Sequence, residues 1–302
     1  MVWPRWRWRV KRWQQGLGGA FPRHREQKKP RLCPACGLLV GAEEKTCSHC
    51  GASMAALSFA GLRRIALALL PAETPFVYAF LYANLLFFLV AWVITLRVDA
   101  SAGGLFGQLD GRVLLQFGAK QGFSIYAQHE YWRLVMPIFL HASIIHLGFN
   151  SFVLWQVGPQ VEELFGSARF LFFYLTTGIV GFLASAWWYH PAALSVGSSG
   201  SLFGLIGILI SYISQGSGFA SQYRTSLTRW AIYVFIMGFF LGADNAAHLG
   251  GLVSGLALGR LVSDRRPATA AQRFAVRLMG WGSAAVILTS LTMTMLHLRP
   301  AS

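Results

Sequence analysis

The chain has 302 residues, of which 55% are hydrophobic and 12% charged, with a formal net charge of +15. A water-soluble domain usually carries about 25% charged residues, so this composition excludes an ordinary soluble protein and indicates several membrane spans. Much of the positive charge precedes residue 32, and it therefore says little about a substrate.

Residues 1–31 form a basic arm in which tryptophans alternate with arginine and lysine. Such an arm binds nucleic acid through phosphate contacts and stacking, or it binds anionic cytoplasmic lipid with its indoles at the interface. Because a membrane protein follows, we favour membrane lipid as the partner, and nucleic acid is not expected.

All four cysteines lie in two CxxC pairs within residues 32–55. Two-residue spacing lets both thiolates of a turn face one ion, and four thiolates make a closed tetrahedral zinc site. The alternatives are two disulfides or a redox pair, which a cytoplasmic position and two matched pairs disfavour. His49 is a possible substitute for one thiolate. The segment resembles a small zinc ribbon, which implies structural zinc and a possible cytoplasmic protein partner. Its expected ligands are Cys33, Cys36, Cys47 and Cys50.

The rest of the chain predicts an all-α, polytopic membrane helix bundle. Residues 56–75 are an interfacial helix or linker, since charges interrupt their apolar stretch. Residues 76–263 form a six-span core, and residues 264–302 supply a cytoplasmic loop and an added span. The long connection over 97–133 is expected to be functional. The predicted spans are 76–96, 134–157, 170–189, 199–214, 230–242, 245–262 and 278–296.

Arginines set the predicted orientation. They occur in the loops after the even-numbered spans, whereas the loops after the third and fifth spans contain no Lys or Arg, although the long first loop has several. Basic loops stay on the cytoplasmic side, so we expect a cytoplasmic N-terminus, in a bacterial inner membrane. Ser199, His248 and His146 then lie in the same outer layer of the membrane.

Ser199 opens the fourth span, and His248 opens the sixth span 49 residues later. A hydroxyl and an imidazole in such positions suggest a nucleophile and a general base, although a serine alone is common in membrane helices. Glycine ladders on both spans permit close helix packing. These ladders are Gly200, Gly204 and Gly207 on one span and Gly251, Gly255 and Gly259 on the other. We therefore expect Ser199 and His248 within hydrogen-bond reach.

His146 and Asn150 are four residues apart and share one face of the second span. Polar groups inside a membrane are costly, so a functional site is the default interpretation, and bonding between neighbouring helices is the alternative. Asp244 precedes His248 by four residues, and we expect it to cap the sixth helix and not to complete a triad.

Together these motifs resemble those of rhomboid intramembrane serine proteases over residues 76–262. The matching pieces are Trp132-Arg133, His146-x3-Asn150, Gly197-x-Ser199-Gly200 and His248-x2-Gly251-x3-Gly255.

The resemblance implies that Ser199 is the nucleophile and His248 the general base of a dyad. The Ser199 backbone N–H with the side chains of His146 and Asn150 then forms the oxyanion hole. Phe203 supports the His248 ring, Arg133 steadies the lateral entrance, and catalysis needs no cofactor. The implied activity is cleavage of transmembrane proteins near the extracytoplasmic face.

Two other functions remain open. A catalytically silent relative would bind transmembrane clients, and retention of the four polar site residues argues against it. A transporter would show ionisable groups through the full membrane depth or inverted repeats, and the sequence shows neither.

Overall fold

The computed structural model describes residues 31–32, 38–41, 44–49, 71, 73–98, 108–213 and 220–298. The chain divides into two compact units, Met1–Leu69 and Leu70–Ser302. In the first unit, strand β1 (Arg31–Leu32) pairs antiparallel with β2 (Leu39–Val40), with Arg31 opposite Val40. Cys47 is buried. The basic arm up to residue 30, the interfacial segment at 56–70, and Cys33, Cys36 and Cys50 lie outside the described residues.

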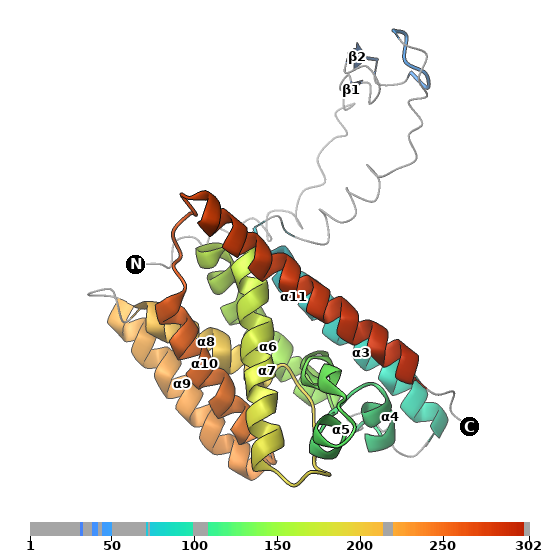
Figure 1. Ribbon diagram of the computed structural model, residues 1–302, viewed down its shortest axis with the longest axis vertical. Helices are drawn as coiled ribbons and strands as arrows, with labels where there is room; N and C mark the ends of the chain where they lie inside the picture. The colour runs from blue at the N-terminus through green and yellow to red at the C-terminus, as the bar shows by residue number, and fades with distance from the viewer. Residues whose placement is uncertain are drawn as a thin grey trace, which may run out of the picture. The chain divides into compact units, whose positions relative to one another are not determined.

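The second unit is helical, as expected, and its long helices gather into one bundle (Figure 1). Among the described helices, three are long and apolar enough to cross a membrane, namely α3, α7 and α11, and α8 is a shorter apolar helix. The long helices are α3 (Pro75–Val98), α6 (Ile144–Phe165), α7 (Ser167–Trp188), α8 (Ser199–Ile213), α9 (Ala220–Leu241), α10 (Asn245–Leu261) and α11 (Ala270–His297).

The predicted second span was wrong at its start. Residues 134–143 are not α-helical, because the chain there makes two 3-10 turns, η1 (Tyr131–Leu134) and η2 (Met136–Phe139). Pro137 cannot donate a backbone hydrogen bond, and Ser143 then caps α6 by accepting the N–H of His146 at 3.2 Å. An apolar run buried by its neighbours gives the same hydropathy whether or not it is a helix.

The helix at the predicted fifth span is longer than the span itself. The span was placed at residues 230–242, but α9 begins at Ala220 and includes Arg224 and Arg229. A helix can extend beyond the apolar layer with its polar turns in water, and hydropathy detects only the apolar part.

Glu162, near the end of α6, joins that helix to the start of α3. Its buried carboxylate accepts the backbone N–H groups of Phe76 at 3.2 Å and Val77 at 3.0 Å, and the Ser167 hydroxyl at 2.7 Å. The first N–H groups of a helix lack intrahelical acceptors and favour a negative charge, so this contact fixes α6 against α3.

The connection at residues 108–139 is compact. It contains α4 (Gly111–Gln116), α5 (Gly122–Tyr126) and the two 3-10 turns, and strand β3 (Lys120–Gln121) pairs antiparallel with β4 (Leu194–Ser195). The short helices α4 and α5 lie beside the bundle (Figure 1). The pairing joins this connection directly to the segment that precedes α8.

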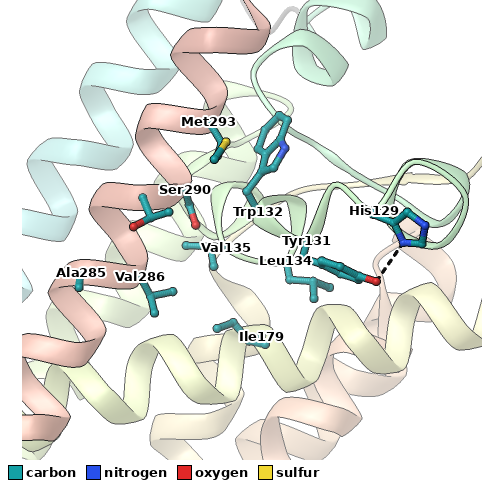
Figure 2. A pocket seen from close by; sticks show the side chains of 11 residues that line it. His129, Tyr131, Trp132, Leu134, Val135, Ile179, Ala285, Val286, Ser290 and Met293 are labelled. Carbon is teal, nitrogen blue, oxygen red and sulfur yellow. Dashed lines mark hydrogen bonds between the residues drawn. The ribbon is translucent and has the colours of Figure 1, made fainter.

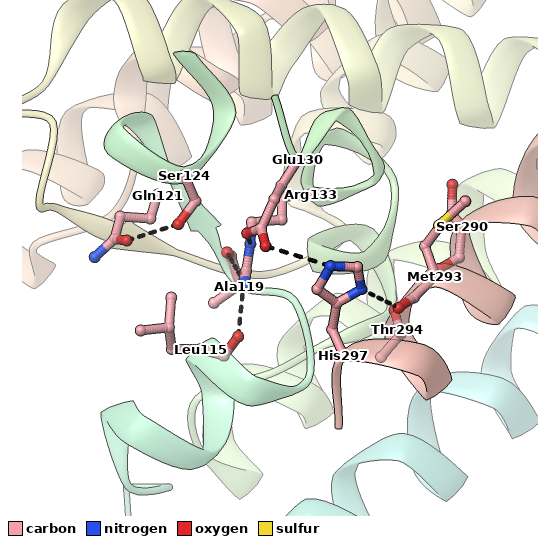
Figure 3. Close-up of polar contacts among 10 residues, drawn as sticks. All are labelled: Leu115, Ala119, Gln121, Ser124, Glu130, Arg133, Ser290, Met293, Thr294 and His297. Atoms are coloured by element: carbon pink, nitrogen blue, oxygen red, sulfur yellow. Dashed lines mark hydrogen bonds and ion pairs between the residues drawn. The ribbon is translucent and has the colours of Figure 1, made fainter. Parts of the chain in front are cut away.

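Arg133 organises this connection from its interior. Its guanidinium pairs with Glu130 and donates to the carbonyl oxygens of Leu115 at 2.7 Å and Ala119 at 3.2 Å (Figure 3). The guanidinium also lies over the Trp132 ring, 4.5 Å from its centroid. A planar cation with several donors suits such a site, since each carbonyl needs a separate N–H.

Helix α11 contacts the same connection. His297 Nε2 lies 3.7 Å from Glu130 Oε1, and Nδ1 donates to the Met293 carbonyl at 2.8 Å (Figure 3). A mainly apolar groove of about 510 Å³ lies between η1, α7 and α11, with Trp132 and Met293 at one end and Val286 and Ile179 at the other (Figure 2). The added helix therefore packs on α7 and on the loop that carries Arg133.

The glycine ladders lie where α8 and α10 cross. A Cβ atom on Gly251 would overlap the Gly200 carbonyl oxygen, and one on Gly255 would overlap the Gly204 carbonyl oxygen. Both obstacles are backbone atoms, so only a shift of a whole helix could relieve them.

Gly255→Ala is expected to lower the free energy of unfolding by about 1–3 kcal/mol, because the added methyl group overpacks the α8–α10 crossing. Thermal unfolding in detergent measures this loss. Gly282→Ala is the matched control, since a Cβ there meets no atom within 4 Å. Equal melting temperatures for the two variants would show that the close crossing is absent.

Candidate active site

Ser199 and His248 meet at the N-terminal ends of two adjacent helices. Ser199 is the first residue of α8, and His248 is in the first turn of α10. The Ser199 hydroxyl lies 2.9 Å from His248 Nε2. The imidazole is buried, whereas Ser199 is half-buried. A hydroxyl bonded to an imidazole is the arrangement that lets a base take the proton of a nucleophile.

Two neighbours hold the His248 ring. Its Nδ1 lies 3.2 Å from Asn245 Oδ1, and the ring stacks on Phe203 with centroids 4.4 Å apart at an interplanar angle of 12°. An amide oxygen only accepts, so Nδ1 carries the proton and Nε2 is free to accept from Ser199. Asn245 was missed by the sequence analysis, although its spacing of three residues from His248 places both on one helix face.

Asp244 caps α10, as expected. Its Oδ1 accepts the backbone N–H of Ala247 at 2.9 Å. The second carboxylate oxygen accepts the hydroxyls of Ser185 and Ser195, the latter at 2.5 Å. The described hydrogen bonds of His248 go to Asn245 and Ser199 and not to this carboxylate.

His146 lies in the first turn of α6, against the loop before Ser199. A Cβ atom on Gly197 would come within 2.7 Å of His146 Cε1 and Nε2. Gly197 has φ of 123°, which side-chain-bearing residues rarely adopt, and its N–H donates to the Pro137 carbonyl at 2.9 Å. Glycine is therefore required here both for conformation and for space.

Asn150 lies one turn after His146 and also contacts this loop. Its Nδ2 donates to the His146 carbonyl at 2.9 Å, and its Oδ1 accepts the Ser198 hydroxyl at 3.2 Å. The Ser199 backbone N–H is in the first turn of α8, where N–H groups lack intrahelical acceptors. His146 and Asn150 thus contact Gly197 and Ser198, the two residues that precede Ser199. Trp132 and Arg133 lie in η1, and Arg133 bonds the carbonyl oxygens of Leu115 and Ala119.

The predicted zinc ligands are described only in part. Among the residues that the structure describes, no group of three or more His, Cys, Asp or Glu side chains is placed to hold a metal. Of the four cysteines, only Cys47 belongs to that set, and its sulfur accepts the backbone N–H of His49 at 3.4 Å.

Comparison with known proteins gives consistent matches. The profile of the rhomboid domain matches residues 128–265. Rhomboid protease GluP of Bacillus subtilis is 42% identical over 153 residues, which is 49% of this chain and 29% of that protein. RHOMBOID-like protein 1 of Arabidopsis thaliana is 35% identical over 151 residues, 48% of this chain and 38% of its own length. Putative rhomboid protease YdcA of Bacillus subtilis is 32% identical over 142 residues, 46% of this chain and 71% of that protein.

The chain belongs to the rhomboid family. Like other rhomboids it is a multi-pass membrane protein, and the matched region contains Ser199, His248 and their hydrogen-bond partners. The match covers well under half the length of the first two relatives, and α3 and α11 lie outside the matched domain.

Proposed function

We propose that this rhomboid is an intramembrane serine endopeptidase that cleaves transmembrane proteins near the extracytoplasmic face. The hydrogen bond between Ser199 and His248, with Asn245 setting the tautomer, carries this proposal. The names of relatives such as Rhomboid protease GluP and Rhomboid-type serine protease 2 of Emericella nidulans support it.

The proposed reaction has two halves. Ser199 Oγ attacks the scissile carbonyl carbon while His248 Nε2 takes its proton, and the peptide oxygen becomes negatively charged. His248 then gives that proton to the leaving amine, which leaves an acyl-enzyme. In the second half, His248 takes a proton from water, the hydroxide attacks the ester, and Ser199 regains its hydrogen. No cofactor takes part.

Stabilisation of the oxyanion is assigned to three groups. The Ser199 backbone N–H, the His146 ring and the Asn150 amide lie around the loop that carries the hydroxyl. Donors held in place before the reaction stabilise the charge that develops on the oxygen without reorganisation.

Labelling with a serine-directed fluorophosphonate tests the function. The intact protein in detergent is expected to form an adduct that peptide mapping places on Ser199. Ser199→Ala should abolish it, whereas Ser201→Ala, one buried serine further along α8, should not. A folded protein that forms no adduct and cleaves no substrate, yet binds a transmembrane peptide, would favour the catalytically silent, client-binding alternative.

We infer that the N-terminus is cytoplasmic in a bacterial inner membrane and that residues 264–302 supply the seventh span. Seven crossings should place residue 1 inside and residue 302 outside. A C-terminal reporter active only in the cytoplasm should therefore stay silent. A signal from the C-terminal fusion, with an N-terminal fusion as positive control, would show that α11 does not cross.

We further propose that residues 32–55 form a structural zinc ribbon, between a lipid-binding arm (1–31) and a linker (56–75). The β1–β2 pairing brings together the chain on both sides of the first cysteine pair. Cys47 is buried and its sulfur accepts an N–H group, as in sites where backbone donors stabilise a thiolate. The ribbon then offers its surface to a cytoplasmic protein.

Removal of residues 1–55 is expected to cost bound zinc but to preserve turnover of a model substrate. Four thiolates leave no coordination position for a reacting water, so the metal has no chemical role. Metal content and turnover are measured together for the full-length and truncated proteins. Loss of turnover when zinc is stripped from the still-folded full chain would contradict this separation.

A further inference from the structure

A second contact joins the two segments that carry the dyad, four residues before each reacting side chain. Ser195 precedes Ser199 by four residues, and Asp244 precedes His248 by four residues. Ser195 donates its hydroxyl to Asp244 Oδ2 at 2.5 Å, while Ser199 and His248 are 2.9 Å apart. The contact thus links the chain just before the hydroxyl to the helix that carries the imidazole.

Asp244 is well suited to hold both segments. Its Oδ1 is occupied by the N–H of Ala247 in α10, so the carboxylate cannot rotate without uncapping that helix. Its Oδ2 accepts Ser195 from β4 and also Ser185 from α7. Hydrogen bonds to an ionised acceptor are roughly twice as strong as those between neutral groups.

The conformation of residues 189–198, the segment before Ser199, depends on contacts with other elements. Residues 189–198 form no helix, and Gly197 within them has a positive φ. On its other side, the segment pairs through β4 with β3, where Lys120 is buried and donates to the Ala193 carbonyl at 3.4 Å. Burial lowers the pKa of Lys120, and the charge of Asp244 opposes that shift.

We propose that Asp244 is a positioning residue that sets the distance between Ser199 and His248 by binding Ser195. This inference rests on the proposed protease function. It assigns Asp244 a task beyond the capping of α10, and it makes Ser195 the residue through which the carboxylate acts on the nucleophile.

A matched pair of variants separates positioning from simple stabilisation. Ser195→Ala and Ser185→Ala each remove one hydroxyl from the same carboxylate oxygen, but Ser185 lies on α7, which carries neither reacting side chain. Each is measured in the full chain for kcat, KM, labelling rate and melting temperature.

Ser195→Ala is expected to lower kcat and the labelling rate by roughly tenfold with little change in KM, since small misplacements of reacting groups are costly. Ser185→Ala should have a melting temperature similar to that of Ser195→Ala. Its kcat should stay within about twofold of the wild-type value, because the geometry of the reacting atoms, which governs the rate, is unchanged. Ser195→Thr retains the hydroxyl and should restore the rate. Asp244→Ala should lower kcat more than Ser195→Ala does. Asp244→Asn can still cap α10 and bond Ser195, so its kcat should fall less than that of Asp244→Ala.

Equal kcat in Ser195→Ala and wild type, or an equal loss in both serine variants, would overturn the inference. Labelling of the wild type distinguishes failure of the positioning role from failure of the proposed protease function. If it labels at Ser199 while Ser195→Ala labels equally fast, only the positioning role fails. If the wild type does not label, the proposed protease function fails and this inference with it.

Discussion

Ser199→Ala and His248→Ala are each expected to abolish cleavage of a model transmembrane substrate while the protein stays folded. Removing the nucleophile or base of a hydroxyl–imidazole unit costs about 10⁴–10⁶-fold in kcat in serine proteases. The 2.9 Å contact makes these two side chains such a unit. Turnover in detergent micelles measures the loss, and circular dichroism checks the fold.

The two variants should also be strongly non-additive. Without Ser199 the imidazole has no nucleophile to deprotonate, and without His248 the hydroxyl has no base, so the double variant should be no slower than the single ones. Ser201→Ala is the control, because it removes a buried hydroxyl two residues further along α8. Near wild-type turnover in Ser199→Ala or His248→Ala would refute the protease assignment.

The second large effect is expected at the oxyanion hole. His146→Ala and Asn150→Ala should each lower kcat with KM nearly unchanged, because they remove donors that act on charge formed only in the transition state. Loss of one such donor typically costs about 10²–10³-fold in kcat. We expect the lower end of this range, since the remaining donors compensate in part.

Asn150 is the sharper test of the two. In the resting structure one of its amide hydrogens is directed at the His146 carbonyl, and an amide has a second hydrogen for a substrate oxygen. Asn150→Asp keeps the acceptor for Ser198 but loses the donor, so it should be as slow as Asn150→Ala. Gln160→Ala, near the opposite end of the same helix, serves as the control. Unchanged kcat in the His146→Ala/Asn150→Ala double variant would make both residues structural.

Several features of the molecule follow from the sequence by itself. Hydropathy over windows of about 20 residues predicts membrane helices, because the apolar thickness sets their length. The glycine spacing of four on residues 251–259 predicts the close crossing, since one helix turn repeats at nearly that interval. The crossing in turn brings Ser199 and His248 together, as predicted. The cap at Asp244 is equally local, because the bond spans only three residues.

Only the tertiary structure decided the remaining features. The late start of α6 depends on burial of an apolar 3-10 segment by other elements, which hydropathy does not register. The contacts of Glu162 with α3 and of Ser195 with Asp244 join residues 85 and 49 positions apart, respectively. Which acceptor a side chain meets across such distances is set by the packing of whole helices and not by local propensity, so no spacing rule in the sequence encodes it.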